Sequence, residues 1–234
     1  MHPRRGAIAF AADLPLEQGL ERYRLVAPWV GVAKVGLSLF VEHGPAAVKA
    51  FQRESAQVFL DLKLHDIPNT VALAAAKAGA LGVSFLTVHA SGGAPMLQAA
   101  LEGAARGAAQ AGVPAPKILA VTVLTSTDGP TLRSTGVEVD ARAQVERLAL
   151  LAVKAGCSGL VCSAQEAKAL RALLGPEVFL CTPGIRPVGA SVGDQARVET
   201  PAAAFAAGSN LLVVGRPLSE AADPAAAARG LHEA

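Results

Sequence analysis

The chain has 234 residues, 52% of them hydrophobic and 17% charged, and its formal net charge at pH 7 is +2. A chain of this length and apolar content can bury a large core, either as one α/β barrel or as two smaller domains. The small net charge and the 4% aromatic content speak against a nucleic-acid-binding surface, which needs basic patches and stacking platforms.

The N-terminal segment and the cysteines indicate a cytoplasmic protein without a membrane anchor. The apolar run at residues 7–12 is stopped by Asp13 and is too short for a signal peptide, and no run is long enough to span a bilayer. The three cysteines, Cys157, Cys162 and Cys181, are odd in number and not closely paired, which is typical of reduced, buried thiols. They form no Cys-x-x-Cys spacing, so no metal site is expected from them.

Short apolar runs rich in β-branched residues alternate along the chain with stretches of helical periodicity. The predicted strands cover residues 7–12, 32–36, 58–62, 85–89, 118–124, 159–162, 178–181 and 211–215. The predicted helices cover residues 16–27, 46–54, 70–78, 94–111, 141–155, 164–174 and 224–232. This alternation predicts one domain over residues 1–234 with an α/β fold, a (β/α)8 barrel. A doubly wound open sheet is the alternative, although no Gly-x-Gly-x-x-Gly opens a helix after the first strand.

The most informative stretch is residues 58–70, where three charges gather at the passage from a strand to a helix. Asp61 and Lys63 are two residues apart, so they point to the same face of the predicted strand. Asp66 falls in the following turn, and Pro68 suits the first turn of a helix. Buried charges are costly unless they pair with one another or with a ligand. A structural salt bridge is the simple interpretation, whereas the carboxyl end of a parallel strand favours a catalytic site.

Other polar residues lie at or just after the ends of the predicted strands. They are Asp13, Lys34, His89, Thr122, Thr125, Ser163, Arg186 and Arg216. Singly, they have structural explanations, since Asp13 could cap the next helix and His89 could be a core histidine. Together they predict a polar mouth on an apolar barrel, which is where this fold carries out catalysis.

Two stretches suggest that this mouth binds a phosphate. Gly215 allows close approach to the backbone, and Arg216 after the last strand offers a guanidinium matched to phosphate oxygens. The Gly- and Pro-rich segment 182–195 is long for a loop of this kind and resembles a lid. Arg186 and Gln195 in that segment could close over the phosphate and exclude water.

At this point the chain resembles the orotidine 5′-monophosphate decarboxylases over nearly its whole length. The most specific motif is residues 61–70, DLKLHDIPNT. Supporting motifs lie at residues 34–37, 121–126, 161–163, 182–187, 193–195 and 214–217. One departure is the Ala-Ala-Asp at residues 11–13, where the family commonly has a larger apolar residue before its aspartate.

The resemblance implies a barrel homodimer with two shared active sites. It implies conversion of orotidine 5′-monophosphate to uridine 5′-monophosphate and CO2, the last step of de novo synthesis of that nucleotide, without metal or organic cofactor. It places Lys34, Asp61 and Lys63 of one subunit with Asp66 of the other. Ile67 and Thr70 would also reach across the dimer.

The resemblance also implies a role for each residue. Lys63 would stabilise the carbanion at C6 of the pyrimidine and then protonate it. Asp61 would lie near the departing carboxylate, while Asp66 and Lys34 would hold the lysine and the ribose in register. The remaining substrate-binding residues would be Asp13 for ribose, Thr125 for the pyrimidine edge, and Arg186, Gln195, Gly215 and Arg216 for phosphate.

Two other functions remain open at the level of sequence. A related sugar-phosphate barrel, such as a 3-keto-gulonate 6-phosphate decarboxylase or a hexulose-phosphate synthase, shares the Asp-x-Lys-x-x-Asp pattern but needs Mg²⁺ for its enediolate. A catalytically silent nucleotide-binding barrel would need the phosphate site but not the costly charge cluster. A metal requirement identifies the first alternative, and tight nucleotide binding without turnover identifies the second.

Overall fold

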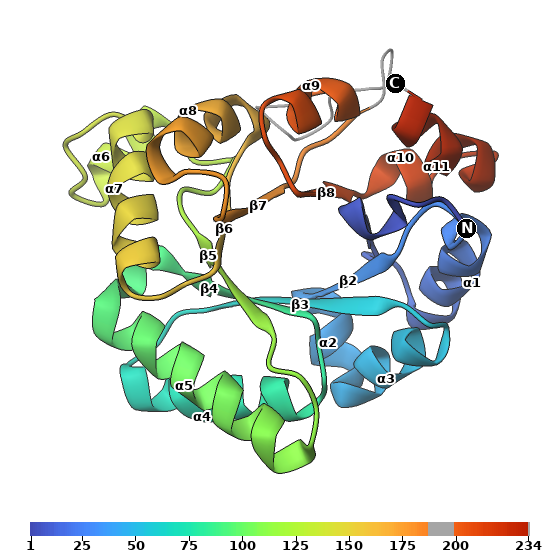
Figure 1. Ribbon diagram of the computed structural model, residues 1–234, viewed down its shortest axis with the longest axis horizontal. Helices are drawn as coiled ribbons and strands as arrows, with labels where there is room; N and C mark the ends of the chain where they lie inside the picture. The colour runs from blue at the N-terminus through green and yellow to red at the C-terminus, as the bar shows by residue number, and fades with distance from the viewer. Residues whose placement is uncertain (187–198, 234) are drawn as a thin grey trace.

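The computed structural model describes residues 1–186 and 199–233, which include a closed barrel of eight parallel strands (Figure 1). The strands are β1 (Ile8–Ala11), β2 (Val32–Gly36), β3 (Gln57–Leu64), β4 (Phe85–His89), β5 (Lys117–Val121), β6 (Gly159–Val161), β7 (Phe179–Thr182) and β8 (Leu211–Val214). Each strand pairs with the next, and β8 closes the barrel by pairing with β1. The predicted (β/α)8 barrel is confirmed, and the open doubly wound sheet is wrong.

Helices surround the barrel in the order of the chain (Figure 1). They are α1 (Leu16–Val26), α2 (Leu37–His43), α3 (Pro45–Arg53), α4 (Pro68–Ala80), α5 (Gly93–Ala111), α6 (Gly129–Ser134), α7 (Ala141–Lys154), α8 (Ala164–Leu174), α9 (Pro201–Ala206), α10 (Arg216–Ser219) and α11 (Pro224–Glu233), with short 3-10 turns η1 (Arg5–Ala7) and η2 (Ala90–Gly92). All seven predicted helices are present. The sequence did not predict α2, α6, α9 and α10, because helices of seven residues or fewer show little periodicity. No described helix has the length and apolarity needed to cross a bilayer.

The buried apolar residues form two separate layers. Alternate residues of the strands fill the inside of the barrel, and their neighbours pack outward against the helices. Phe59, Phe85 and Phe179 meet inside, with ring centroids 5.9 and 5.3 Å apart for the two successive pairs. This inner layer closes the barrel below its mouth, so the strand ends that carry the polar residues stand on a packed floor.

Helices α4 and α5, which follow β3 and β4, pack unusually close together. Gly79, Gly103 and Gly107 lie at the contact, and a Cβ added at any of them would collide with a main-chain carbonyl of the opposite helix. The absence of side chains at these positions lets the two backbones touch. The strand that carries both Asp61 and Lys63, β3, and its neighbour β4 are therefore followed by a closely packed helix pair.

Two predicted strand boundaries are corrected by the structure. The third strand runs to Leu64 rather than ending at residue 62, so Lys63 lies within it. The fifth strand ends at Val121 rather than at residue 124, so Thr122 and Thr125 lie in the loop that follows. Residues 122–124 are apolar enough to resemble a strand, but no partner strand extends far enough to pair with them.

Candidate active site

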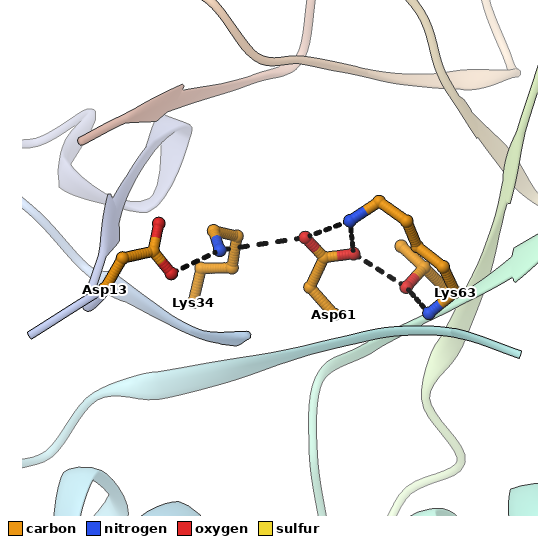
Figure 2. Close-up of polar contacts among 5 residues, drawn as sticks. Asp13, Lys34, Asp61 and Lys63 are labelled. Carbon is orange, nitrogen blue, oxygen red and sulfur yellow. Dashed lines mark hydrogen bonds and ion pairs between the residues drawn. The ribbon is translucent and has the colours of Figure 1, made fainter. Parts of the chain in front are cut away.

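Asp61 is the centre of a row of alternating charges at the mouth of the barrel (Figure 2). Lys63 Nζ lies 2.9 Å from each carboxylate oxygen of Asp61. Lys34 Nζ, from β2, lies 3.7 Å from Asp61 Oδ2 and 3.2 Å from Asp13 Oδ1. Asp13 follows β1, so three consecutive strands bring together four residues that the sequence proposed for the site.

The burial of Asp61 is compensated by its two lysine neighbours. The residue is only 8% exposed. Burial by itself raises the pKa of the Asp61 carboxyl, but the charges of Lys34 and Lys63, with hydrogen bonds from Lys63 and Thr87, lower this pKa below its ordinary value. The carboxylate is therefore held in its charged form inside the barrel, as the sequence predicted for paired buried charges.

Asp13 does not cap the helix that follows it, which was the alternative interpretation of this residue. The N-cap of α1 is Pro15, which makes no side-chain cap, and Asp13 bonds to Lys34 instead. The helix-cap interpretation is wrong because the chain turns before Pro15, which leaves the carboxylate beside the neighbouring strand.

The main chain at Lys63 is not regular strand. Its φ angle is +49°, a left-handed conformation that non-glycine residues rarely adopt. The pairing register with β4 shifts here, since Leu60 lies opposite Leu86 and Leu64 lies opposite Val88. A bulge of this kind re-aims side chains next to active sites. Lys63 shares a face with Asp61, as predicted, but this bulge interrupts the regular alternation on which the prediction was based.

Thr87 of β4 bridges the two catalytic candidates, and sequence reasoning missed it. Its hydroxyl donates to Asp61 Oδ1 at 2.9 Å and accepts from the Lys63 main-chain N–H at 2.9 Å. A signal was available, because Thr87 and His89 are alternate residues of a predicted strand and must share one face. It was overlooked because threonine is common in strands for packing reasons alone.

A cavity of about 180 Å³ lies beside the charge row. Lys34, Asp61 and Lys63 form one side of it, and Thr125 also lines it. The remaining lining residues are Phe59, Val121, Val123, Leu124, Val161, Cys162, Cys181, Pro183 and Val213. The cavity therefore has one mainly apolar wall and one charged edge.

A second cavity of about 550 Å³ adjoins the first, since Lys34, Pro183 and Val213 line both. Its other lining residues include Asp13, Gly184, Arg186, Gly215 and Arg216. Gln195, the remaining phosphate-binding candidate, lies outside the described residues.

The two arginines of the second cavity favour an anion. Burial, followed by the positive charge of Arg216, holds the pKa of Arg186 below its ordinary value. Arg186 is only 8% exposed, and Arg216 begins α10 directly after Gly215. Glu220 lines the same cavity and partly offsets the repulsion between the two arginines. An anion bound beside both guanidinium groups would offset it further.

Asp66, Ile67 and Thr70 do not join the charge row of their own chain. Asp66 Oδ1 accepts a hydrogen bond from the Ile67 N–H at 2.7 Å, and across residues 1–186 and 199–233 Asp66 forms no ion pair with a lysine or arginine. All three residues are exposed, Ile67 by 67%. These residues are on the rim of the mouth, where another molecule can reach them.

The two histidines stand beside the charge row. The His65 and His89 ring centroids are 5.6 Å apart. Burial, then the neighbouring charges of His65 and Lys63, lowers the pKa of His89 below its ordinary value. His89 is therefore neutral at pH 7.

Two residues of the predicted polar mouth point elsewhere. The Thr122 hydroxyl donates to the Val161 carbonyl at 3.1 Å, and Ser163 is fully buried at the start of α8. Neither lines the two cavities of the mouth. Both residues lie directly after or close to strand ends, as predicted. The Thr122 side chain, however, binds a main-chain carbonyl, and Ser163 lies at the start of a helix.

The cysteines are free and buried, as predicted. Burial raises the pKa of Cys157 to about 11 and that of Cys162 to about 12, and it raises the pKa of Cys181 well above its ordinary value. Protonated thiols are poor nucleophiles and poor metal ligands. In the described part of the chain, no three His, Cys, Asp or Glu side chains are grouped so as to hold a metal ion.

Comparison with known proteins identifies the family. A family model described as "Orotidine 5'-phosphate decarboxylase / HUMPS family" matches residues 7–231. The chain belongs to this family. Residues 7–231 span nearly the whole chain, which confirms the resemblance drawn from the motifs.

Individual relatives agree over most of their length. A protein named orotidine 5′-phosphate decarboxylase from Anaeromyxobacter sp. strain K is 54% identical, with 96% of each chain covered. Another of that name, from Thermobifida fusca, is 54% identical over 96% of this chain and 93% of its own. The crystal structure of the Lactobacillus acidophilus orotidine 5′-phosphate decarboxylase superimposes with a TM-score of 0.81 at 36% identity and covers 97% of both chains.

Proposed function

We propose that this protein is a carbon–carbon lyase that converts orotidine 5′-monophosphate to uridine 5′-monophosphate and CO2. The observation that carries the proposal is the row Asp13–Lys34–Asp61–Lys63, which borders one cavity and leads to an adjoining, arginine-lined cavity. Membership of the family, with relatives of this name at 54% identity, supports it. In the cell the reaction would be the last step of uridine 5′-monophosphate synthesis in the cytoplasm.

The two cavities divide the substrate between them. The 5′-phosphate lies beside Arg186, Gly215 and Arg216. The family resemblance adds Gln195, outside the described residues, as a further donor. The ribose lies along Asp13, which lines the larger cavity, and Lys34, which lines both cavities. Binding energy from the phosphate, remote from the reacting carbon, is then available to position the base.

The pyrimidine occupies the smaller cavity with C6 toward Lys63. Thr125 lies within the lining and is placed to hydrogen-bond the edge of the ring. Apolar side chains, among them Val161 and Val213, cover the rest of the base and exclude water. In this water-poor setting the charges at the other edge act more strongly than they would in solvent.

Lys63 supplies the charge and the proton that the reaction needs. The bond between C6 and the carboxylate breaks, CO2 leaves, and the electron pair remains on C6. The Lys63 ammonium stabilises this developing carbanion and transfers a proton from Nζ to C6, which gives uridine 5′-monophosphate. The neutral lysine recovers its proton from solvent, so the reaction consumes one proton and needs no cofactor.

Asp61 orients the lysine and opposes the substrate carboxylate. Both of its oxygens hold Lys63 Nζ at 2.9 Å, which limits where the ammonium can point. The negative charge of Asp61 lies beside the place where the substrate carboxylate would bind. Losing that carboxylate as neutral CO2 removes the repulsion, so Asp61 favours the reaction.

The active site is completed by a second copy of the chain. Asp66, Ile67 and Thr70 of one subunit would reach the mouth of the other, where Asp66 would hold Lys63 from the side opposite Asp61. The exposed apolar side chains on the segments after β2 and β3 support such an interface. They are Leu37, Val41, Ile67 and Leu73.

Ultraviolet absorbance of orotidine 5′-monophosphate incubated with purified protein and excess EDTA tests the reaction. We expect loss of the orotate chromophore and formation of uridine 5′-monophosphate. Activity on a keto-sugar phosphate that appears only on adding Mg²⁺ would instead place the protein with the sugar-phosphate enzymes. Tight binding of uridine 5′-monophosphate without turnover would favour a binding protein.

Mixed dimers of Lys63→Ala and Asp66→Ala subunits test the shared site. In a heterodimer, one site combines both substitutions and the other has neither, so an inactive pair should regain activity. The control is a mixture in which subunit exchange is prevented by chemical cross-linking of each homodimer. Verified heterodimers without activity would show that each barrel uses its own Asp66.

A further inference from the structure

Thr87 forms hydrogen bonds with both the main chain of Lys63 and the carboxylate of Asp61. It is fully buried and lies behind the charge row, outside the lining of both cavities of the mouth. Thr87 therefore does not face the space in which a substrate would lie. Its influence on chemistry passes through the two residues that it holds.

The direction of the two hydrogen bonds is determined by their chemistry. The main-chain N–H of Lys63 can only donate, so Thr87 Oγ1 accepts that bond at 2.9 Å. The single hydroxyl proton of Thr87 is then directed to Asp61 Oδ1, also at 2.9 Å. Hydrogen bonds to a charged acceptor are stronger than neutral ones, so the pair of bonds favours one orientation of the carboxylate.

The same hydroxyl supports an unusual backbone. Lys63 has a φ of +49°, and the only other non-glycine residue with positive φ in the described chain is Ser55, which lies outside the helices and strands. At the register shift between Leu60 and Leu64, the N–H of Lys63 is bonded to a side chain of β4. Such a conformation persists only where its surroundings hold it in place.

We propose that Thr87 is a positioning residue for the decarboxylation. It holds the left-handed main chain of Lys63 and the orientation of Asp61 together, so that Lys63 Nζ is presented to the reacting carbon. This inference rests on the function proposed above, because it concerns where the proton donor points. It adds to that function a residue from β4, a strand that supplies no side chain to either cavity lining.

Thr87→Val tests the proposal, because it keeps the shape of the side chain and removes both hydrogen bonds. We expect kcat on orotidine 5′-monophosphate to fall about ten- to a hundredfold, the effect of losing a hydrogen bond to a charged group. KM should stay close to the wild-type value, because the phosphate and ribose contacts are untouched. Thr87→Ser, which restores the hydroxyl, should recover most of kcat.

Tyr23→Phe is the control. Tyr23 in α1 is equally buried, and its hydroxyl donates to the Val30 carbonyl at 3.4 Å, outside both cavities of the mouth. The substitution removes the same group at the same depth and should leave kcat unchanged. If Thr87→Val does not fold, Thr87→Cys provides a similar volume with a weaker donor, and its kcat should lie below that of Thr87→Ser.

The outcomes separate the two proposals. A folded wild-type protein without decarboxylase activity would overturn the proposed function and this inference with it. An active wild type with kcat unchanged in Thr87→Val, or in Thr87→Cys where only that variant folds, would overturn the role of Thr87 alone. A fall in kcat that Thr87→Ser does not recover, or that Tyr23→Phe reproduces, would also overturn it, because a general loss of core packing or stability would then be the cause.

Discussion

The wall of the smaller cavity has two halves that differ in chemistry although they share one fold. The half formed by β1 to β4 presents mainly charges, backed by the hydroxyl of Thr87, whereas the half formed by β5 to β8 presents mainly apolar side chains and thiols. Arg186 and Arg216, which follow β7 and β8, line the larger cavity instead. The first half contributes Lys34, Asp61 and Lys63, with Asp13 and Thr87 hydrogen-bonded to them, and the second contributes Val121, Val161, Cys181 and Val213.

This division shows how a barrel can bury charge. Each charged residue of the first half has its partner on the next strand or two residues along its own, so its loss of hydration is offset directly. The apolar half in turn keeps water away from the charged half, which strengthens the electrostatic interactions there.

Among substitutions on the charged side of the cavity, removal of the proton donor should have the largest effect on kcat. In Lys63→Ala, the charged half loses the group that stabilises and protonates C6, and kcat should fall by at least about a thousandfold. The ultraviolet assay measures the loss. Lys117→Ala is the matched control, since Lys117 is an exposed lysine at the opposite end of the barrel and its removal should leave kcat unchanged. Substantial activity in Lys63→Ala would remove this residue as the proton donor.

Removal of an arginine from the larger cavity should weaken substrate binding more than it slows the chemical step. In Arg216→Ala, the apparent KM for orotidine 5′-monophosphate should rise about ten- to a hundredfold, because a charge-assisted contact to the phosphate is lost. Steady-state kinetics measures the effect. Arg142→Ala, which removes a surface arginine paired with Glu146 on α7, is the control. An unchanged KM in Arg216→Ala would mean that the phosphate binds elsewhere.

Acid should lower the free energy of unfolding by protonating Asp61 and weakening its ion pairs with the two lysines. The folded-state pKa of Asp61 is lowered, so its ionisation stabilises the protein above the unfolded-state value of about 3.9. This contribution is lost as the pH falls through the folded-state pKa, when the carboxylate takes up a proton. Urea unfolding between pH 7 and pH 3 should show the decline for the wild type and a weaker one for Asp61→Asn. Parallel pH dependences for the two proteins would contradict the assignment.

The smallest effect is expected from thiol reagents, which should not label the buried cysteines of the native protein. Burial keeps Cys157 and Cys162 protonated, with pKa values of about 11 and 12. Iodoacetamide at pH 8 should therefore leave both unlabelled in the native protein and label them after unfolding in urea. Mass spectrometry of tryptic peptides gives the readout. Labelling of Cys162 in the native state would show that water and small polar molecules reach the apolar wall.

Much of the architecture was determined by local sequence pattern. Alternating apolar runs and helical stretches predicted the barrel, because each element must bury one face against the next. The placement of Asp13, Lys34, Asp61 and Lys63 near one another also followed from sequence, since the carboxyl ends of parallel strands meet at one end of a barrel. Only the arrangement of strand ends was needed for that inference.

The tertiary structure decided the details that depend on neighbouring strands. Thr122 and Ser163 occupy strand ends like the others but turn their hydroxyls away from the cavities. Thr87 resembles an ordinary strand residue, yet the register of β4 against β3 places it between Asp61 and Lys63. The left-handed main chain of Lys63 has the same origin. Local periodicity determines which face a side chain uses, whereas register between strands is set by contacts distant in sequence, and those contacts complete the site.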